Sequence, residues 1–266
     1  MNVLVIGVTG ELGREVASLL GRRDDVGVRA FVRRPLPDGG PPVDEVVLGD
    51  LRDPGALRAA CAGVTSVFLV SSPTRDQVEL ETNAIEAAEA AGVERIVKVS
   101  NIPIAGLETG LHGNHRAIER RLAASDCAAT ILQPSFFSSV IDKQGDVVGR
   151  GAVVLPTGPG KIAWIDPSDI AAVGAEALVR SDLDGALHLT GPDALDGDEV
   201  AARLGVKRID LPLDRWRETV VASGLDPWLA DSSVHLFEAV ARGALAEVTD
   251  TVERVLRRPP RRVFGR

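Results

Sequence analysis

Met1-Asn2-Val3-Leu4-Val5-Ile6-Gly7-Val8-Thr9-Gly10-Glu11-Leu12-Gly13 begins the chain with an apolar run that leads into three evenly spaced glycines. Strand formers before Gly7 and an amphipathic pattern over residues 16–20 predict a strand, a tight turn and a helix. We expect Gly7 to permit the turn, Gly10 to let backbone amides approach a pyrophosphate, and Gly13 to let the helix pack closely on the strand. The helix N-terminus then presents unpaired N–H groups to phosphate. The alternative is a glycine-rich turn with no ligand.

The composition narrows the classes of protein that fit. A chain of 266 residues suits one large α/β domain, alone or with a small appendage. Its formal charge of -8 disfavours nucleic acid as a partner, because phosphate binding needs a basic surface. No run of eighteen apolar residues occurs and the first apolar run is too short for a signal peptide, so we expect a soluble, cytoplasmic protein with no membrane partner.

The two cysteines, Cys61 and Cys127, form no metal-binding spacing with each other or with histidine. The sequence therefore predicts no metal site. We interpret both cysteines as buried apolar residues, with a reactive thiol as the alternative.

Two arginines come directly after the second predicted strand, which covers residues 28–32. Arg33 and Arg34 stand about twenty residues beyond the glycine turn, where an acidic residue would bind the ribose hydroxyls of NAD. A guanidinium instead offers paired donors and a permanent positive charge to a 2′-phosphate. The pair therefore predicts NADP(H) in preference to NAD(H), with Arg33 as the main contact. The alternative is a solvated basic turn.

Asp50 and Leu51 follow the next strand at its carboxyl end, where such sheets bind nucleotides. Asp50 can accept a hydrogen bond from the adenine amino group while Leu51 packs on the ring. Asp53 is expected to cap the helix that begins at Pro54.

Strands and helices alternate through the first half of the chain. Such alternation predicts a Rossmann fold, a doubly wound parallel sheet in an α/β domain over residues 1–139. The expected strands cover 28–32, 43–48, 64–70, 93–99 and 129–132, and the expected helices cover 54–61, 76–91 and 113–124.

The regular alternation of strands and helices ends near residue 140. The pattern over residues 140–266 predicts a smaller, mostly helical substrate cap. A strand near 186–190 is expected to return to the main sheet. The other expected elements are a loop over 156–161, a strand over 162–165, a helix over 167–179 capped by Asp166, and helices over 198–204, 214–222, 227–242 and 249–257.

With these segments in place, the chain resembles the NmrA-like atypical short-chain dehydrogenase/reductases, which include NAD(P)H:quinone reductases and redox-sensing regulators. The resemblance implies a dinucleotide site at the carboxyl edge of the sheet and a substrate pocket under the cap. It is carried by Gly7–Gly13, Val28–Pro35, Gly49–Leu51, Asn83–Ser100, His115–Ser125, Thr130–Phe137 and Ile165–Ala171.

The sequence departs from the wider superfamily at its catalytic pair. Carbonyl-reducing members use a Tyr-x-x-x-Lys pair, which falls here on Leu111 and His115, and the chain contains no tyrosine at all. The resemblance implies that His115 either hydrogen-bonds the nicotinamide ribose or donates a proton. The alternative is a surface or capping histidine. The family's usual Leu-Arg-Pro-Gly is also changed, to Leu132-Gln133-Pro134-Ser135.

These observations give a set of expected site residues. His115 is the candidate catalytic residue. The expected cofactor contacts are Gly7, Thr9, Gly10, Glu11, Leu12, Gly13, Arg33, Arg34, Asp50, Leu51, Val70, Ser71, Ser72, Ser100, Asn101, His115, Pro134, Ser135 and Phe136. The expected substrate pocket comprises Asn101, His112, Phe136, Phe137, Trp164, Trp216 and Trp228, and the aromatic residues suit a planar, apolar ligand.

Three functions fit this sequence. The first is an NADPH-dependent oxidoreductase that transfers hydride to a quinone or similar conjugated acceptor, because such acceptors do not need a strong tyrosine acid. The second is a regulator that senses NADP(H) without turnover, and the third is a non-redox tailoring enzyme on the same fold. The sequence is compatible with a monomer or a homodimer.

Overall fold

The computed structural model describes residues 1–265 and divides them into two compact units. The first unit comprises Met1–Asn101, Asn114–Gln133 and Ile170–Leu187, and the second comprises Ile102–Gly113, Pro134–Asp169 and the residues from His188 onward. The division expected between residues 139 and 140 stays a prediction, and its last residue, 266, lies outside the described residues.

The first unit is built on a seven-stranded sheet in the order β3-β2-β1-β4-β5-β6-β8. All the neighbouring strands from β3 to β6 pair in parallel, which confirms the predicted Rossmann fold. The strands are β1 (Asn2–Ile6), β2 (Gly27–Val32), β3 (Glu45–Leu48), β4 (Ser66–Leu69), β5 (Arg95–Val99), β6 (Ala128–Pro134) and β8 (Gly185–Leu189).

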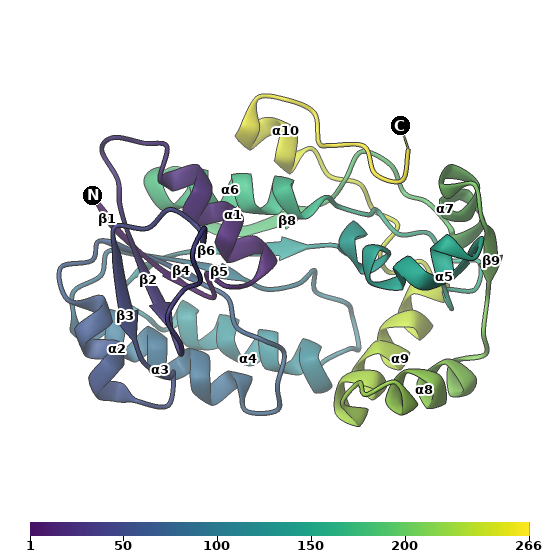
Figure 1. Cartoon of the computed structure of the whole chain (residues 1–266), viewed down its shortest axis with the longest axis horizontal. Helices are drawn as coiled ribbons and strands as arrows, with labels where there is room; N and C mark the ends of the chain where they lie inside the picture. The colour runs from purple at the N-terminus through teal and green to yellow at the C-terminus, as the bar shows by residue number, and fades with distance from the viewer. Residues whose placement is uncertain (266) are drawn as a thin grey trace. The chain divides into compact units, whose positions relative to one another are not determined.

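Helices cover both faces of this sheet (Figure 1). Helices α1 (Glu11–Leu20) and α6 (Pro167–Val179) lie on one face. Helices α2 (Pro54–Cys61), α3 (Gln77–Ala90) and α4 (Gly110–Ala123) lie on the other. The apolar core between the sheet and this second helical layer includes Leu57, Ile85, Ile96 and Ile118, each fully buried.

Short-range sequence signals predicted the bounds of several of these elements well. Helix α2 has the predicted bounds, because the Asp53 side chain accepts hydrogen bonds from the backbone N–H groups of Gly55 and Ala56 at 2.8 and 3.1 Å. Helix α4 begins at Gly110, three residues before the predicted start at 113, where the positive φ of that glycine sets the turn into the helix.

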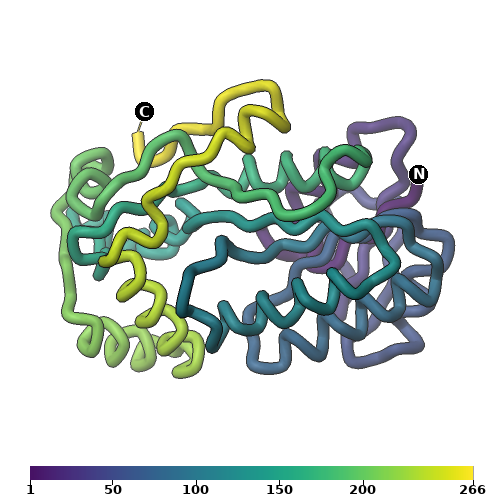
Figure 2. The backbone as a smooth tube through the Cα atoms, turned by 180° about the vertical axis from the view of Figure 1, so that it is seen from behind, coloured from purple at the N-terminus to yellow at the C-terminus, as the bar shows by residue number. Residues whose placement is uncertain are grey.

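The second unit contains short elements that the sequence analysis did not predict. Residues 138–149 form two 3₁₀ turns, η1 (Ser138–Val140) and η2 (Asp142–Gln144), followed by α5 (Gly145–Gly149). Strands β7 (Ala152–Val154) and β9 (Lys207–Ile209) form a small parallel sheet. The remaining helices are α7 (Gly197–Leu204), α8 (Leu213–Ala222), α9 (Pro227–Ala241) and α10 (Thr251–Leu256), with α8 and α9 packed side by side (Figure 2).

The predicted strand over residues 162–165 is wrong. Ile162 makes isolated bridges to Leu195 and to Leu245, and Ile165 bridges Phe137. The segment is apolar because it is buried, and it contacts several different loops where a strand would pair with one neighbour.

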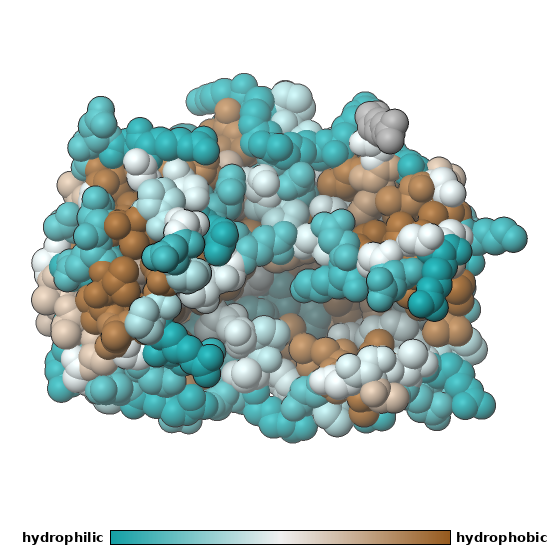
Figure 3. Space-filling view, viewed as in Figure 1, coloured by the Kyte–Doolittle hydropathy of each residue, from teal (hydrophilic) through white to brown (hydrophobic). Residues whose placement is uncertain are grey.

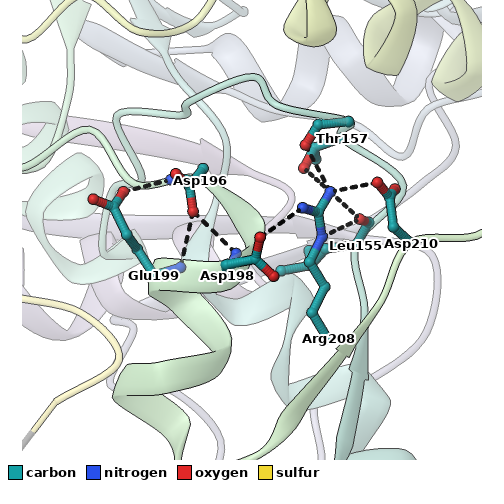
Figure 4. Close-up of polar contacts among 8 residues, drawn as sticks. Leu155, Thr157, Asp196, Asp198, Glu199, Arg208 and Asp210 are labelled. Atoms are coloured by element: carbon teal, nitrogen blue, oxygen red, sulfur yellow. Dashed lines mark hydrogen bonds and ion pairs between the residues drawn. The ribbon is translucent and has the colours of Figure 1, made fainter.

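Arg208 ties β9 to the loop that follows β7 (Figure 4). Its guanidinium donates to the carbonyl oxygens of Leu155 and Gly158 and to the Thr157 hydroxyl, at 2.7 to 3.2 Å. Asp210 pairs with the same group at 3.0 Å. The Arg208 guanidinium, 9% exposed at its side chain, therefore satisfies two backbone carbonyls of this turn.

Helix α7 begins beside this network with a capping box (Figure 4). The Asp196 carboxylate accepts from the backbone N–H groups of Asp198 and Glu199, and the Glu199 carboxylate accepts from the Asp196 N–H at 2.9 Å.

Apolar side chains gather at the outer edge of the sheet, over β3 (Figure 3). Val46 and Leu48 of this edge strand are 42% and 54% exposed. Nowhere in residues 1–265 is there a helix long and apolar enough to cross a membrane.

A comparison of two glycines tests the packing of the first turn. Gly7 has φ of +90°, and a Cβ built there would lie 2.3 Å from the Val70 carbonyl oxygen. Gly63 has φ of +70° with open space around it. We expect Gly63→Ala to destabilise the fold by about 1–2 kcal/mol through backbone strain, and Gly7→Ala by about 1–3 kcal/mol more through steric overlap. Urea unfolding measures the stability of both variants. Equal losses of stability would mean that the close approach to Val70 does not add to the cost of the Gly7 change.

Candidate functional site

A pocket of about 220 Å³ lies in the first unit, where the carboxyl ends of β1 to β4 meet. Nucleotides bind at this edge in open parallel sheets. Of the expected cofactor contacts, the pocket brings together Gly7, Thr9, Arg33, Asp50, Leu51, Val70, Ser71 and Ser72.

The glycine turn beside this pocket has the geometry that a pyrophosphate needs. The Gly10 N–H donates to the Gly7 carbonyl at 2.9 Å, which closes the turn, and a Cβ at Gly13 would lie 2.3 Å from that same oxygen. Among the described residues no side chain caps α1 at Gly10, the residue that precedes its first turn. The N–H groups of a first turn have no partners within their own helix, so this end of α1 fits a bound phosphate.

The two arginines after β2 occupy different positions. Both side chains are exposed, and Arg33 lines the pocket whereas Arg34 does not. A third arginine, Arg52, also lines the pocket and was not predicted. Arg52 pairs with the carboxylate of Asp76, which also lines the pocket, and its backbone N–H donates to Asp50 at 2.9 Å.

Asp76 remains ionised at neutral pH. A hydrogen bond from the Thr74 side chain lowers the pKa of its carboxyl, and Arg52 lowers it further. The pocket wall therefore carries two anionic groups, Asp50 and Asp76, that compete with a bound phosphate for Arg52 but leave Arg33 unopposed in the lining.

A buried polar network extends inward from Ser71. The Ser71 hydroxyl donates to Glu81 at 2.7 Å, and the other oxygen of Glu81 lies 3.0 Å from the Lys98 ammonium. The side chains of Glu81 and Lys98 are fully buried. The Lys98 nitrogen lies 3.5 Å from Nδ1 of His115, the candidate catalytic residue, on α4.

Ser100 and Asn101, both expected cofactor contacts, are fixed at the end of β5 by two charged residues of α4. Arg116 donates to the Ser100 hydroxyl and to both oxygens of Asn101, at 2.7 to 3.1 Å. Glu119 pairs with Arg116 at 2.9 Å and accepts from Ser100 at 2.6 Å and from the Gln133 amide at 2.9 Å. Gln133 therefore binds a carboxylate that already pairs with the positive charge of Arg116.

The remaining expected residues belong to the second unit. Phe136 packs against Trp164 with ring centroids 5.2 Å apart and against Phe237 at 6.0 Å, and Trp216 packs on Phe237 at 5.1 Å. Trp164 is only 1% exposed and lies in the core of this unit.

Elsewhere in the second unit, Pro134, Ser135 and His112 are buried, while Phe137 and Trp228 are partly exposed. The structure groups Phe136, Trp164 and Trp216 with Phe237 in one aromatic cluster. The substrate role of all these residues stays a prediction.

Both cysteines are buried, as predicted. Burial raises the pKa of the Cys61 thiol to about 11 and raises that of Cys127 as well. Both therefore remain protonated at neutral pH, which makes them poor nucleophiles.

Sequence reasoning missed Arg52, Asp76, Glu81 and Lys98. Arg52 directly follows the predicted contacts Asp50 and Leu51, so its position carried a usable signal. The Glu81–Lys98 pair carried none, because it joins a helix to the strand after it through a contact that local spacing does not reveal.

Comparison with known proteins agrees with this architecture. The family model described as NAD(P)H-binding matches residues 7–180. An NAD(P)H azoreductase of Xenophilus azovorans is 34% identical, over 97% of this chain and 94% of its own length. A (4-alkanoyl-5-oxo-2,5-dihydrofuran-3-yl)methyl phosphate reductase of Streptomyces griseus is also 34% identical, with the same coverage. The structure of an Escherichia coli NADPH-dependent quinone oxidoreductase in complex with NADPH superposes with a TM-score of 0.87, at 26% identity, over 98% of this chain and 97% of that one.

Two Arg–Glu pairs with the same helical spacing test the energetics of the α4 cluster. Arg116 and Glu119 are 14% and 15% exposed, whereas Arg215 and Glu218 on α8 are 70% and 64% exposed. We expect Arg116→Met to cost about 2–4 kcal/mol, because it leaves a largely buried carboxylate without its cation. Arg215→Met should cost about 0.2–0.5 kcal/mol.

The double change Arg116→Met with Glu119→Gln should recover much of that loss, because no lone charge remains. Urea unfolding of the purified variants measures all three. Similar losses for the two single changes would contradict the assignment of a buried cluster.

Proposed function

This chain belongs to the NAD(P)H-binding family, and we propose that it is an oxidoreductase that takes hydride from NADPH, in preference to NADH, and delivers it to a quinone or a similar conjugated acceptor. The observation that carries the proposal is the pocket at the carboxyl edge of the sheet. There an uncapped glycine turn lies next to Arg33, in a position where NAD-binding members of the fold carry an acidic residue.

The cofactor preference follows from charge. A 2′-phosphate on the adenosine ribose would lie near the end of β2, where the guanidinium of Arg33 can bind it with paired hydrogen bonds. Asp50 and Leu51 would hold the adenine, and Ser71 and Ser72 would border the phosphates. Ser100 and Asn101, fixed by Arg116, would face the nicotinamide half.

The acceptor class follows from what the chain lacks. A bound dinucleotide supplies a hydride, so quinone, NADPH and one proton give hydroquinone and NADP⁺. Leu111 stands where a tyrosine acid would, and the chain contains no tyrosine elsewhere. A conjugated acceptor spreads the charge that arrives with the hydride and can take its proton from water. A simple ketone needs the acid, so we expect it to be a poor substrate.

The relatives support the same class. Two of them are an azoreductase and a quinone oxidoreductase by name, and both names describe acceptors that are conjugated. The protein's own contribution to the rate is then orientation of acceptor and nicotinamide.

A second candidate is a sensor that binds NADP(H) without turnover. The missing tyrosine favours it too, because loss of the acid is what a non-catalytic descendant of a reductase would show. Its expected signature is binding without oxidation.

Titration calorimetry with NADPH, NADP⁺ and NADH, followed by NADPH oxidation with a panel of quinones, azo dyes and simple ketones, separates these functions. We expect selective NADPH binding and turnover with quinones or azo dyes, with little or no activity on ketones. Binding without oxidation of any acceptor would favour the sensor, and no binding would overturn both.

Arg33 tests the cofactor preference. We expect Arg33→Ala to weaken NADPH by about 10- to 100-fold, because a charge-assisted pair of hydrogen bonds is lost, and to leave NADH almost unchanged. Arg34→Ala should have a smaller effect, and Arg22→Ala, an exposed change after α1, should have none. Equal losses of NADPH and NADH affinity in Arg33→Ala would refute the 2′-phosphate assignment.

A further inference from the structure

We propose that Lys98, held by Glu81, is a positioning residue that keeps His115 neutral with its proton on Nε2. His115 then acts as a hydrogen-bond donor at the nicotinamide end of the site, and the proton of the reaction comes from water. The role of His115 as a donor in the reaction rests on the proposed function, whereas the protonation state of its imidazole in the free protein does not.

The proton count at Lys98 fixes the tautomer. An ammonium group has three N–H donors and no acceptor. The Lys98 nitrogen donates to the Val99 carbonyl, forms an ion pair with the Glu81 carboxylate at 3.0 Å, and lies 3.5 Å from Nδ1 of His115. Nδ1 faces a group that can only donate, so Nδ1 is the unprotonated nitrogen and the imidazole proton sits on Nε2.

The same contact opposes protonation of the imidazole. A proton on Nδ1 would place a second positive charge against the fully buried ammonium of Lys98, on β5. Glu81, on α3, is already committed to Lys98 and to the side chains of Ser71 and Gln77. On α4, the neighbouring Arg116 and nearby Glu119 pair with each other.

The proposed effect on His115 gives a functional reason for the Glu81–Lys98 ion pair, which is costly to bury. Removing two charges from water costs several kcal/mol each, and packed apolar residues of similar volume often do as well. Glu81 and Lys98 are both fully buried, and the pair spans from Ser71 in the pocket lining to His115. A neutral imidazole that donates from Nε2 suits an acceptor that needs orientation more than it needs a strong acid.

The state of His115 can be read directly by nitrogen-15 NMR of the histidine rings. The chain has four histidines, and a His115→Gln variant identifies the His115 signals by their absence. In the wild-type protein we expect a neutral ring with an unprotonated Nδ1 that does not titrate between about pH 5.5 and 8.

The double variant Lys98→Met with Glu81→Gln removes both charges together, so no lone buried charge remains. We expect its His115 to show a mixture of tautomers and to gain a proton within the same pH range. An unchanged tautomer and titration in the double variant would overturn the proposal, as would a wild-type ring with its proton on Nδ1.

A second pair on the same strand provides the matched control. Arg95, at the other end of β5, pairs with Asp184 and is 10% exposed at its side chain. The double change Arg95→Met with Asp184→Asn also removes an ion pair from β5 and should leave the His115 signals unaltered. If it shifts them as the Lys98 variant does, the effect is a general loosening of β5 and the positioning role is refuted.

Kinetics connect this state to the reaction. In the Lys98→Met/Glu81→Gln variant we expect kcat with a quinone to fall about tenfold, less than removal of a true acid would cause, while the Kd for NADPH changes by no more than about twofold. An unchanged kcat alongside an altered tautomer would overturn the role of Lys98 in the reaction. Failure of the wild-type protein to reduce any acceptor would refute the proposed function and leave the NMR result to decide the state of His115.

Discussion

The close contact between the two ends of the glycine turn determines the rest of the site. Gly13 lies against the Gly7 carbonyl, and Gly7 lies against the carbonyl of Val70, so β1, α1 and the end of β4 meet with almost no space between their backbones. A single methyl group at either glycine would force them apart. The pocket lining begins at these residues and continues across the carboxyl ends of the next strands, so this contact sets where the glycine turn lies in the pocket.

The sequence predicted this half of the molecule well because its signals are local. The alternation of strands and helices, the Asp53 cap and the glycine spacing each lie within a few residues of the structure they specify. The predictions failed where contacts are distant in the chain. Ile162 is apolar and β-branched, as in a strand, but it meets Leu195 and Leu245 through separate single bridges. Nothing near residue 162 encodes those partners.

The same limit applies to the candidate site. Arg33, Asp50 and Leu51 could be predicted because their distance from the glycine turn is fixed by the fold, and they do line one pocket. The Lys98–Glu81 pair could not, because a lysine within an apolar strand gives no hint that its partner lies seventeen residues earlier on the preceding helix. In the same way, nothing in the sequence indicated that Glu119, on α4, accepts a hydrogen bond from the Gln133 amide.

Two carboxylates of the first unit, one buried and one partly buried, are each bound by several neighbouring side chains. Glu119 is committed to Arg116, Ser100 and Gln133, and Glu81 is committed to Lys98, Ser71 and Gln77. The Lys98 ammonium, whose nitrogen lies 3.5 Å from Nδ1 of His115, opposes a proton on that nitrogen. A site of this kind is poor at supplying a proton but good at holding fixed dipoles, because paired charges in a buried network keep their geometry while a reaction proceeds. That property suits transfer of hydride to an acceptor whose own conjugation carries the new charge.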